Sequence, residues 1–426
     1  MGAREHSFPG HRTEQFAEAL LAAGCEVTAV VLAEGSRHHG RKAPRLRLHS
    51  LPAERFRAGV ELQAIHDAAA PDVVVAAGGY HAARVVSGLT TSVPRWIDLP
   101  GDLAAEGQLR AHAEGDARLR DPLSVLARAL TAGDQFSVVG ASQRLALLGQ
   151  LGLCGRLTGA TLGQEPVAIV PLACDGPVQA VPLAAGPLRL LWYGGYNTWM
   201  DAETLLAGLE SALGSDPAIR FESTGGAIRD HDELSYGRFW ERARASPVAA
   251  RLLDHGRIPR RRATALLDEC HVVLCLSRAC LESELGSRFR LIEALAHGRP
   301  VVATRGGDLA RDVELAEAGI LVPPGEPRAL ARAVLALASD RPRLEACARN
   351  ARSLWQARFT YAAATEPLRA WLAAPRCWPR SILGEVVAAD SERQRLQSEL
   401  DAIRGSRTFR ALRIFDRLTR RGGEGR

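Results

Sequence analysis

The strongest constraint on the fold is the stretch from residue 282 to residue 325, in which helix-type and strand-type patterns alternate. Apolar residues spaced as on one face of a helix run from 287 to 297, and a Gly-Arg-Pro turn separates them from a buried strand at 301–303. A second helix opened by Asp308 and a second strand at 320–322 follow. Strands joined by crossing helices are parallel, so this stretch predicts an open α/β sheet.

Two features of this stretch predict a binding site at the carboxyl ends of its strands. Gly306 and Gly307 follow the first strand and directly precede a helix, where the lack of a Cβ lets backbone N–H groups approach an anion such as a diphosphate. Glu293 interrupts an otherwise apolar helix, so we expect it to be partly buried and to need a donor. That donor is either a hydroxyl pair of a sugar or ribose, or Arg290 one helical turn earlier.

Residues 293–304 read EALAHGRPVVAT and resemble the donor-binding core of the family-4 retaining glycosyltransferases, which have the GT-B fold. The signature of that family has another glutamate eight positions earlier, where this chain has Leu285. A sub-branch similar to polysaccharide-cluster enzymes instead has an acid eleven positions earlier, followed by two arginines. Glu282, Arg288 and Arg290 fit that spacing.

The resemblance implies a role for each of these residues. Glu293 would contact the ribose of a nucleotide diphosphate sugar, and either Glu282 or Glu284 would contact the sugar. Arg288 and Arg290, with the glycine turn, would neutralise the diphosphate. The family also implies retention of anomeric configuration, no metal or other cofactor, and a place in polysaccharide biosynthesis at the cell envelope.

The same resemblance implies that the chain has two Rossmann-like domains facing a cleft. A run rich in proline and glycine at 177–187 predicts the linker between them. The expected parts are an acceptor domain at 1–183, a donor domain at 188–360, a returning helix at 361–378 and a helical basic tail at 379–426.

A second glycine turn is expected in the donor domain, where Gly194 and Gly195 follow a predicted strand at 189–193 and Asn197 comes shortly after. Many family-4 enzymes have an arginine and then a lysine near this strand end, and neither is present here. The Asn-x-Trp-x-Asp run is similar to the polysaccharide sub-branch. These three residues are therefore assigned to donor binding, and phosphate neutralisation falls to Arg288 or Arg290.

In the amino-terminal half, a short strand at 95–97 leads into a cluster of acids. Asp98 and Asp102 follow the strand, and Glu106 lies one turn into the next helix. The cluster resembles a D-L-x-G-D-x-x-x-E-x-Q pattern of bacterial sugar transferases and would project toward the cleft. Asp98 or Asp102 would then serve the acceptor hydroxyl as a general base. The alternative is Asp102 as a helix N-cap, with Glu106 on a solvated face.

The amino end begins with a helix, and a strand at 27–32 follows it. This order resembles a GT-B amino-terminal domain whose opening strand is absent. Either the coding start is placed too late or the sheet lacks a strand. The first interpretation is favoured, because a missing central strand would leave backbone groups unpaired.

Composition excludes several classes of site. The chain of 426 residues has eight cysteines without the spacings of a zinc site. Lys42 is its single lysine and lies far from the donor region, which disfavours a pyridoxal-phosphate enzyme. The formal charge is +6, but residues from 402 onward hold eight arginines and two acids, so the body is close to neutral. A nucleic-acid-binding groove is therefore not expected.

The absence of both a long apolar run and a secretion signal predicts a cytoplasmic protein. Residues 403–426 alternate arginines with large apolar side chains, a pattern that suits an anionic membrane surface. Such a tail would place the protein peripherally at the inner face of the membrane. A partner-binding helix and a disordered tail are the alternatives.

The resemblance implies a hexosyltransferase that binds a nucleotide-sugar donor and a carbohydrate or lipid-linked acceptor. A nucleotide-sugar epimerase on the same fold is one alternative, and it would need paired acids or histidines in the cleft. A catalytically silent scaffold is another, and the missing arginine and lysine favour it.

Overall fold

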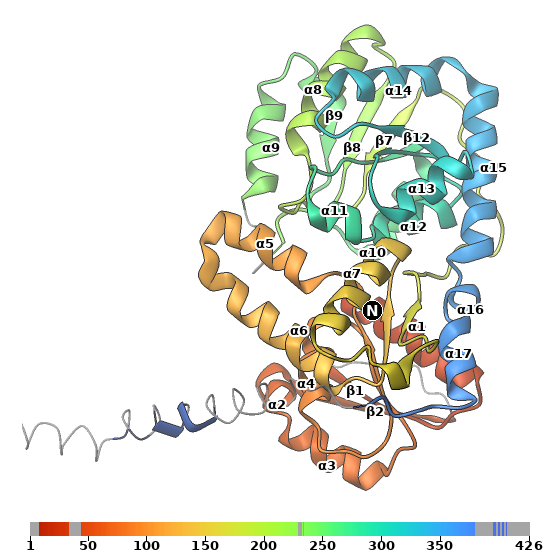
Figure 1. Ribbon diagram of the computed structural model, residues 1–426. Coiled ribbons are helices and arrows are strands. Elements are labelled where there is room, and N and C mark those ends of the chain that lie inside the picture. The colour runs from red at the N-terminus through yellow and green to blue at the C-terminus, as the bar shows by residue number, and fades with distance from the viewer. Residues whose placement is uncertain are drawn as a thin grey trace, which may run out of the picture.

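The computed structural model describes residues 8–33, 44–228, 232 and 234–379, with short parts of the tail between 395 and 406. Its strands form three parallel sheets covered by helices (Figure 1). The upper half of Figure 1 holds the carboxyl-terminal sheet, and the lower half holds the amino-terminal strands. The predicted α/β class is confirmed.

The carboxyl-terminal sheet has six parallel strands in the order β12-β11-β10-β7-β8-β9. The strands are β7 (Arg189–Trp192), β8 (Arg220–Ser223), β9 (Leu252–Asp254), β10 (Val272–Cys275), β11 (Val301–Thr304) and β12 (Gly319–Val322). The helices between and after them are α8 (Ala202–Ser215), α9 (Ser235–Arg244), α10 (Arg260–Glu269), α11 (Leu281–Leu285), α12 (Phe289–Ala296), α13 (Gly307–Leu315), α14 (Pro327–Ser339) and α15 (Arg341–Arg358).

Residues 282–325 form the expected helices and strands. The helix expected at 287–297 is α12, and the strands expected at 301–303 and 320–322 are β11 and β12. Every residue of β10 and β11 is buried, which is why these strands are almost purely apolar. The core of this half joins them to the inner faces of α8, α12 and α14.

The amino-terminal strands lie in two sheets. One pairs β1 (Val27–Ala33) with β2 (Leu46–Pro52), and the other has the order β3-β4-β5-β6. The strands of the second sheet are β3 (Val74–Ala76), β4 (Arg95–Asp98), β5 (Gln135–Val138) and β6 (Val167–Ile169). The helices are α1 (Phe8–Ala22), α2 (Ala53–Ala58), α3 (Val60–Ala69), α4 (Tyr80–Gly88), α5 (Leu103–Glu114), α6 (Arg120–Ala132) and α7 (Ala141–Leu153).

Within the described residues no strand joins β1 to β3. Both sheets still pack on one core, because Val30 and Leu32 of β1 contact the same apolar cluster as the residues of β3 to β6.

The chain returns to the amino-terminal half after α15. Helices α16 (Tyr361–Ala364) and α17 (Glu366–Leu372) run down beside α1 at the lower right of Figure 1. Leu368 and Trp371 of α17 pack against Phe16 and Trp96, and the two tryptophan rings meet edge to face at 5.3 Å. The last helix therefore belongs to the amino-terminal core.

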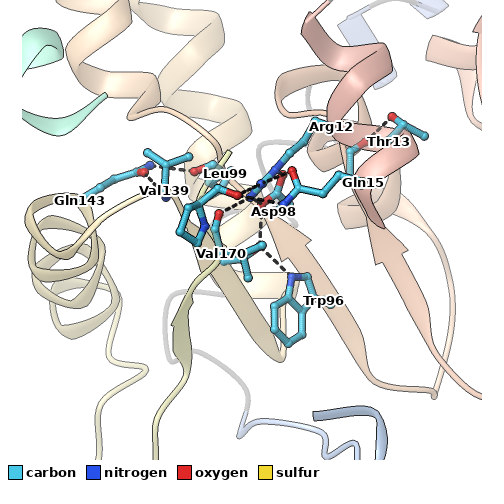
Figure 2. Close-up of polar contacts among 12 residues, drawn as sticks. Arg12, Thr13, Gln15, Trp96, Asp98, Leu99, Val139, Gln143 and Val170 are labelled. Carbon is cyan, nitrogen blue, oxygen red and sulfur yellow. Dashed lines mark hydrogen bonds and ion pairs between the residues drawn. The ribbon is translucent and has the colours of Figure 1, made fainter. Parts of the chain in front are cut away.

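A buried ion pair fixes α1 to the sheet that it covers. The Nε and Nη2 atoms of Arg12 donate to the two carboxylate oxygens of Asp98, at 2.9 and 2.7 Å. Arg12 also donates to the carbonyls of Val170 and Pro171, just beyond β6. Figure 2 shows Arg12 reaching from α1 to the end of β4, with Trp96 below. Both charged side chains are almost fully buried.

The predicted tail from 379 onward lies almost wholly outside the described residues, so its membrane contact stays a prediction. Of the helices that the structure describes, none is long and apolar enough to cross a membrane.

The Arg12–Asp98 pair makes a prediction about stability. Replacing Asp98→Ala leaves a buried guanidinium without its counter-charge, so we expect the free energy of unfolding to fall by about 3–5 kcal/mol. Urea unfolding followed by circular dichroism measures the change. The control is Glu114→Ala, which removes an exposed ion pair with Arg118 and should cost less than about 1 kcal/mol. Equal effects of the two substitutions would contradict a stabilising role for Asp98.

Candidate functional site

The two halves of the molecule meet at the carboxyl ends of their strands. Helix α11, which follows β10, contacts α5 and α7 of the amino-terminal half, and α13 also contacts α7. Figure 1 shows α11 and α13 directly above α5 and α7. In open parallel sheets ligands bind at this edge, so a binding site is expected there.

A pocket lies between the ends of β10 and β11 and the helix α11. Three arginines, Arg278, Arg288 and Arg305, line it together with Glu284 and Gly306. A pocket with more basic than acidic side chains suits an anionic ligand.

The predicted glycine turn forms one wall of this pocket. Gly306 and Gly307 have φ angles of 145° and 69°, which favour glycine, and they open α13. The N–H of Gly307 donates to Oε2 of Glu284 at 3.2 Å. A Cβ on Gly306 would come within 2.9 Å of the same carboxylate. The partner of this N–H is thus the chain's own Glu284, and the predicted binding of a diphosphate stays a prediction.

The next residue of α13 joins the two halves. Asp308 accepts hydrogen bonds from the N–H of Ser142 at 2.7 Å and from its hydroxyl at 3.2 Å. Ser142 lies in the first turn of α7, where N–H groups have no partner within the helix. A Cβ on Gly140 would come within 2.4 Å of the Asp308 carboxylate, so a larger residue there would displace this carboxylate from Ser142. The position of α7 is therefore coupled to the glycine turn.

The second glycine turn lies against Arg290. Nη2 of Arg290 donates to the carbonyl of Gly195 at 2.7 Å, and its guanidinium lies 5.3 Å from the centre of the Trp192 ring. Gly194 has a φ angle of 94°, and a Cβ there would lie 3.6 Å from Nη2 of Arg290. Burial lowers the pKa of Arg290, because the surroundings disfavour its charged form.

Several buried polar atoms around this turn have no hydrogen-bond partner among the described residues. They are Nη1 of Arg290, Oδ1 of Asn197, Oγ1 of Thr198 and Nε1 of Trp192. Buried polar groups are normally paired. The sequence predicted Asn197 and Arg290 as donor-binding residues but missed Thr198 and Trp192, which look like ordinary turn and core residues.

Arg288 and Glu282 bind each other. Nη1 and Nη2 of Arg288 donate to the two oxygens of Glu282 at 2.8 and 2.6 Å. The sequence had assigned one of them to the diphosphate and the other to the sugar. Their fork-to-fork pairing leaves fewer free donors and acceptors for a ligand, although Arg288 still lines the pocket.

Glu293 is buried, as expected, but its partner is not the one expected. Nη2 of Arg260, at the start of α10, donates to Oε1 of Glu293 at 2.8 Å. The alternative pairing with Arg290 is wrong, since Arg290 reaches to Gly195 instead. Burial raises the pKa of Glu293 despite the charge of Arg260. Sequence analysis did not identify Arg260 as the partner of Glu293. The only sequence signal for it is its position directly after the Gly-Arg-Ile-Pro turn.

The structure does not support either predicted base in the amino-terminal half. Asp98 is fully buried, and its oxygens accept from Arg12 and from the hydroxyl of Ser137. Asp102 caps α5 by accepting from the N–H of Ala105 at 2.8 Å, and its other oxygen accepts from Gln150 at 3.0 Å. Both carboxylates thus hold backbone or side chains in place, and the N-cap alternative for Asp102 is confirmed.

In the part of the chain that the structure describes, no group of three or more histidine, cysteine, aspartate or glutamate side chains could hold a metal ion.

The chain is similar to known glycosyltransferases in part of its sequence and in its fold. Residues 187–340 match the family model described as Glycosyl transferases group 1. The matched segment contains the whole six-stranded sheet, both glycine turns, Arg290 and Glu293. No curated protein sequence is similar enough to the chain to count as a match.

Solved structures resemble the chain over most of its length. Sucrose-phosphate synthase (tll1590) from Thermosynechococcus elongatus is 19% identical with a TM-score of 0.66, covering 84% of this chain and 92% of that chain. Anabaena Alr3699/HepE in complex with UDP and glucose is 17% identical with a TM-score of 0.62, covering 84% and 95%. WaaG, a glycosyltransferase involved in lipopolysaccharide biosynthesis, is 14% identical with a TM-score of 0.61, covering 88% and 98%. These likenesses show that the chain has the GT-B fold.

A third acid of the amino-terminal cluster, Glu106, lies on α5, the helix that α11 contacts. Glu106 of α5 is partly buried, and burial raises its pKa to about 7, helped by the negative charge of Glu282 on α11. A Cβ on Gly101 would come within 2.4 Å of Oε1 of Glu106. The carboxylate is therefore folded back over Gly101.

The raised pKa of Glu106 predicts a pH dependence of stability. Between about pH 4.5 and pH 7 the folded protein holds a proton on Glu106 that the unfolded chain has lost, so stability falls as pH rises through this range. Glu106→Gln removes this loss. At pH 8 we expect the free energy of unfolding of the variant, measured with urea, to exceed that of the wild type by about 1–3 kcal/mol. Near pH 4.5 the two proteins should have the same free energy of unfolding.

The matched control for this measurement is Glu114→Gln, at the exposed end of the same helix. It should show no such gain at pH 8. A Glu106→Gln variant that follows the wild-type stability curve at every pH would show that Glu106 ionises as an ordinary surface glutamate.

Proposed function

We propose that the protein is a glycosyltransferase that moves a hexose from a nucleotide diphosphate sugar to a carbohydrate or lipid-linked acceptor, with retention of anomeric configuration. The observation that carries the proposal is the group of buried, unpartnered polar atoms around the Gly194–Gly195 turn. They lie in the segment that matches the glycosyl transferase family. A ligand rich in hydroxyl and phosphate oxygens would supply the missing partners.

Both glycine turns suit the diphosphate of such a donor. Gly307 already binds a carboxylate oxygen, and a diphosphate oxygen would take the place of Glu284 there. Glu284 is exposed, so its side chain is free to turn away into solvent. Arg290 supplies positive charge at the other turn, where one of its nitrogens has no partner among the described residues.

Charge builds on the diphosphate as the bond to the sugar breaks, and fixed donors at that position lower the barrier. We assign this role to Arg290 and the N–H groups of the glycine turn, and we propose no cofactor. Glu293, oriented by Arg260, is assigned to the ribose, and the paired Glu282 and Arg288 are assigned to the sugar. Anabaena HepE was solved with UDP and glucose, which supports a nucleotide and a sugar as ligands of this fold.

The test is an assay for release of nucleoside diphosphate. The protein is incubated with UDP-glucose, UDP-N-acetylglucosamine or GDP-mannose, each with and without a panel of oligosaccharides and polyprenyl-phosphate-linked sugars. We expect release that depends on the acceptor. A rearranged nucleotide sugar without release would indicate the epimerase, and binding without either reaction would indicate the silent scaffold.

The same assay tests the role proposed for Arg290. Arg290→Gln removes the charge beside the glycine turn, and we expect kcat to fall by about 100- to 1000-fold. The control is Arg262→Gln, which removes an exposed arginine paired with Glu269 on α10 and should keep nearly full activity. If both variants retain activity, Arg290 does not stabilise the leaving diphosphate.

A further inference from the structure

Helix α7 of the amino-terminal half is capped by a residue of the other half. Its own N-cap residue is Gly140, which has no side chain to bond the free N–H groups of the first turn. Asp308, at the start of α13, accepts instead from the N–H and the hydroxyl of Ser142, at 2.7 and 3.2 Å. The helix dipole also favours a negative charge at this end. The first turn of α7 is therefore held by the carboxyl-terminal half.

The same turn of α7 holds the carboxyl ends of two strands of the amino-terminal sheet. Gln143, next to Ser142, accepts from the N–H of Val139 at 3.0 Å and donates to the carbonyl of Leu99 at 2.8 Å. Val139 follows β5 and Leu99 follows β4, and Figure 2 shows Gln143 bonded to both. The side chain of Gln143 is buried. The edge of the sheet that faces the donor half is thus attached to the turn that Asp308 caps.

These bonds form a continuous connection between the two halves. It begins at Gly307, whose N–H we assign to the donor diphosphate, and the next residue is Asp308. From Asp308 it continues through Ser142 and its neighbour Gln143. It ends at the carboxyl ends of the amino-terminal strands, the edge at which ligands of such sheets bind. The donor turn and the expected acceptor edge are therefore joined by a few direct hydrogen bonds.

A second contact between the halves lies beside the donor arginines. The ring of His11, near the start of α1, stacks on the ring of Phe289, with centroids 5.0 Å apart and planes at 28°. Phe289 is the first residue of α12 and stands between Arg288 and Arg290 in the chain. Two bodies that touch at one point can still rotate about it, whereas a second contact removes most of that freedom.

Resting on the proposed transferase function, we propose that Asp308 is a positioning residue of the transfer reaction, which fixes the acceptor edge of the amino-terminal half relative to the donor diphosphate. In this role Asp308 contacts neither substrate. It acts through Ser142 and the first turn of α7, and the stack of His11 on Phe289 supplies the second fixed point. A displacement of about 1 Å between reacting groups can slow a reaction by about 100-fold, so such a residue controls the rate without touching the reacting atoms.

Asp308→Ala removes the acceptor of both hydrogen bonds. We expect kcat/KM for the acceptor, measured at saturating donor, to fall by about 10- to 100-fold. The affinity for the nucleoside diphosphate of the active donor, measured by calorimetry, should stay unchanged, whereas a defect in the donor site would weaken it. Asp308→Asn keeps an oxygen that can accept from the N–H of Ser142, so it should restore most of the lost rate.

Gly140→Ala disturbs the same contact from the other half. Gly140 has a φ angle of −161°, which any residue adopts, and a Cβ there would come within 2.4 Å of the Asp308 carboxylate. The methyl group should displace this carboxylate at little cost to the fold, because a side-chain end can move. We expect a loss similar to that of Asp308→Ala. The double variant should lose no more than Asp308→Ala alone, since both substitutions act through one contact.

The matched control is Glu314→Gln, at the other end of α13, where an exposed glutamate pairs with Arg305. It should behave as the wild type. The assay uses the nucleotide sugar and saccharide that give turnover in the panel above. If the wild type transfers no sugar from any donor, the proposed function falls and this role falls with it.

Three results with an active wild type would overturn the positioning role alone. Asp308→Ala could keep its kcat/KM for the acceptor, or it could lose affinity for the nucleoside diphosphate in the same proportion as its rate. Asp308→Asn could also be as slow as Asp308→Ala, which would show that the hydrogen bond to Ser142 does not set the rate.

Discussion

Carbonyl groups at the ends of short strands and helices must find hydrogen-bond donors when they are buried, and in this protein arginines supply many of them. Four buried arginines donate to carbonyls outside their own element: Arg12 to Val170 and Pro171, Arg156 to Leu130, Thr131 and Gly133, Arg299 to Val181 and Cys270, and Arg352 to Pro177 and Ala296. A guanidinium carries five N–H donors in a rigid fork. Each of these side chains therefore ties a loop or strand end to an element far away in the sequence.

Some charged side chains are fully bonded within the fold, whereas others keep atoms that could bind a ligand. Asp98 and Asp102 have their oxygens taken up by the fold. Arg290 also donates to a carbonyl, but it does so at the carboxyl edge of the sheet and keeps one nitrogen without a partner among the described residues. Glu284 has an N–H partner in the glycine turn while its side chain is exposed. The groups that remain for a ligand thus lie at the edge where the halves meet.

Much of the fold could be predicted from the sequence, because apolar strands, glycine turns and amphipathic helices are local patterns. The run from α12 to β12 is an example, since each element there carries its own signal. The ion pairs of the site could not be predicted in the same way. Arg12 and Asp98 are 86 positions apart, and Arg260 and Glu293 are 33 apart. Such partners are set by the packing of whole elements, on which local spacing carries no information.

The same reasoning applies to the acids of the amino-terminal cluster, whose partners could not be predicted from their spacing. By spacing, Asp98, Asp102 and Glu106 follow one strand and would project toward the cleft. Two long-range contacts give them different surroundings: α1 brings Arg12 onto Asp98, and α11 packs against α5, which carries Glu106. The first contact gives a buried carboxylate its counter-charge, whereas burial, helped by the charge of Glu282, raises the pKa of Glu106 to about 7. A chemically suitable residue type is therefore only a candidate until the partners that the fold gives it are known.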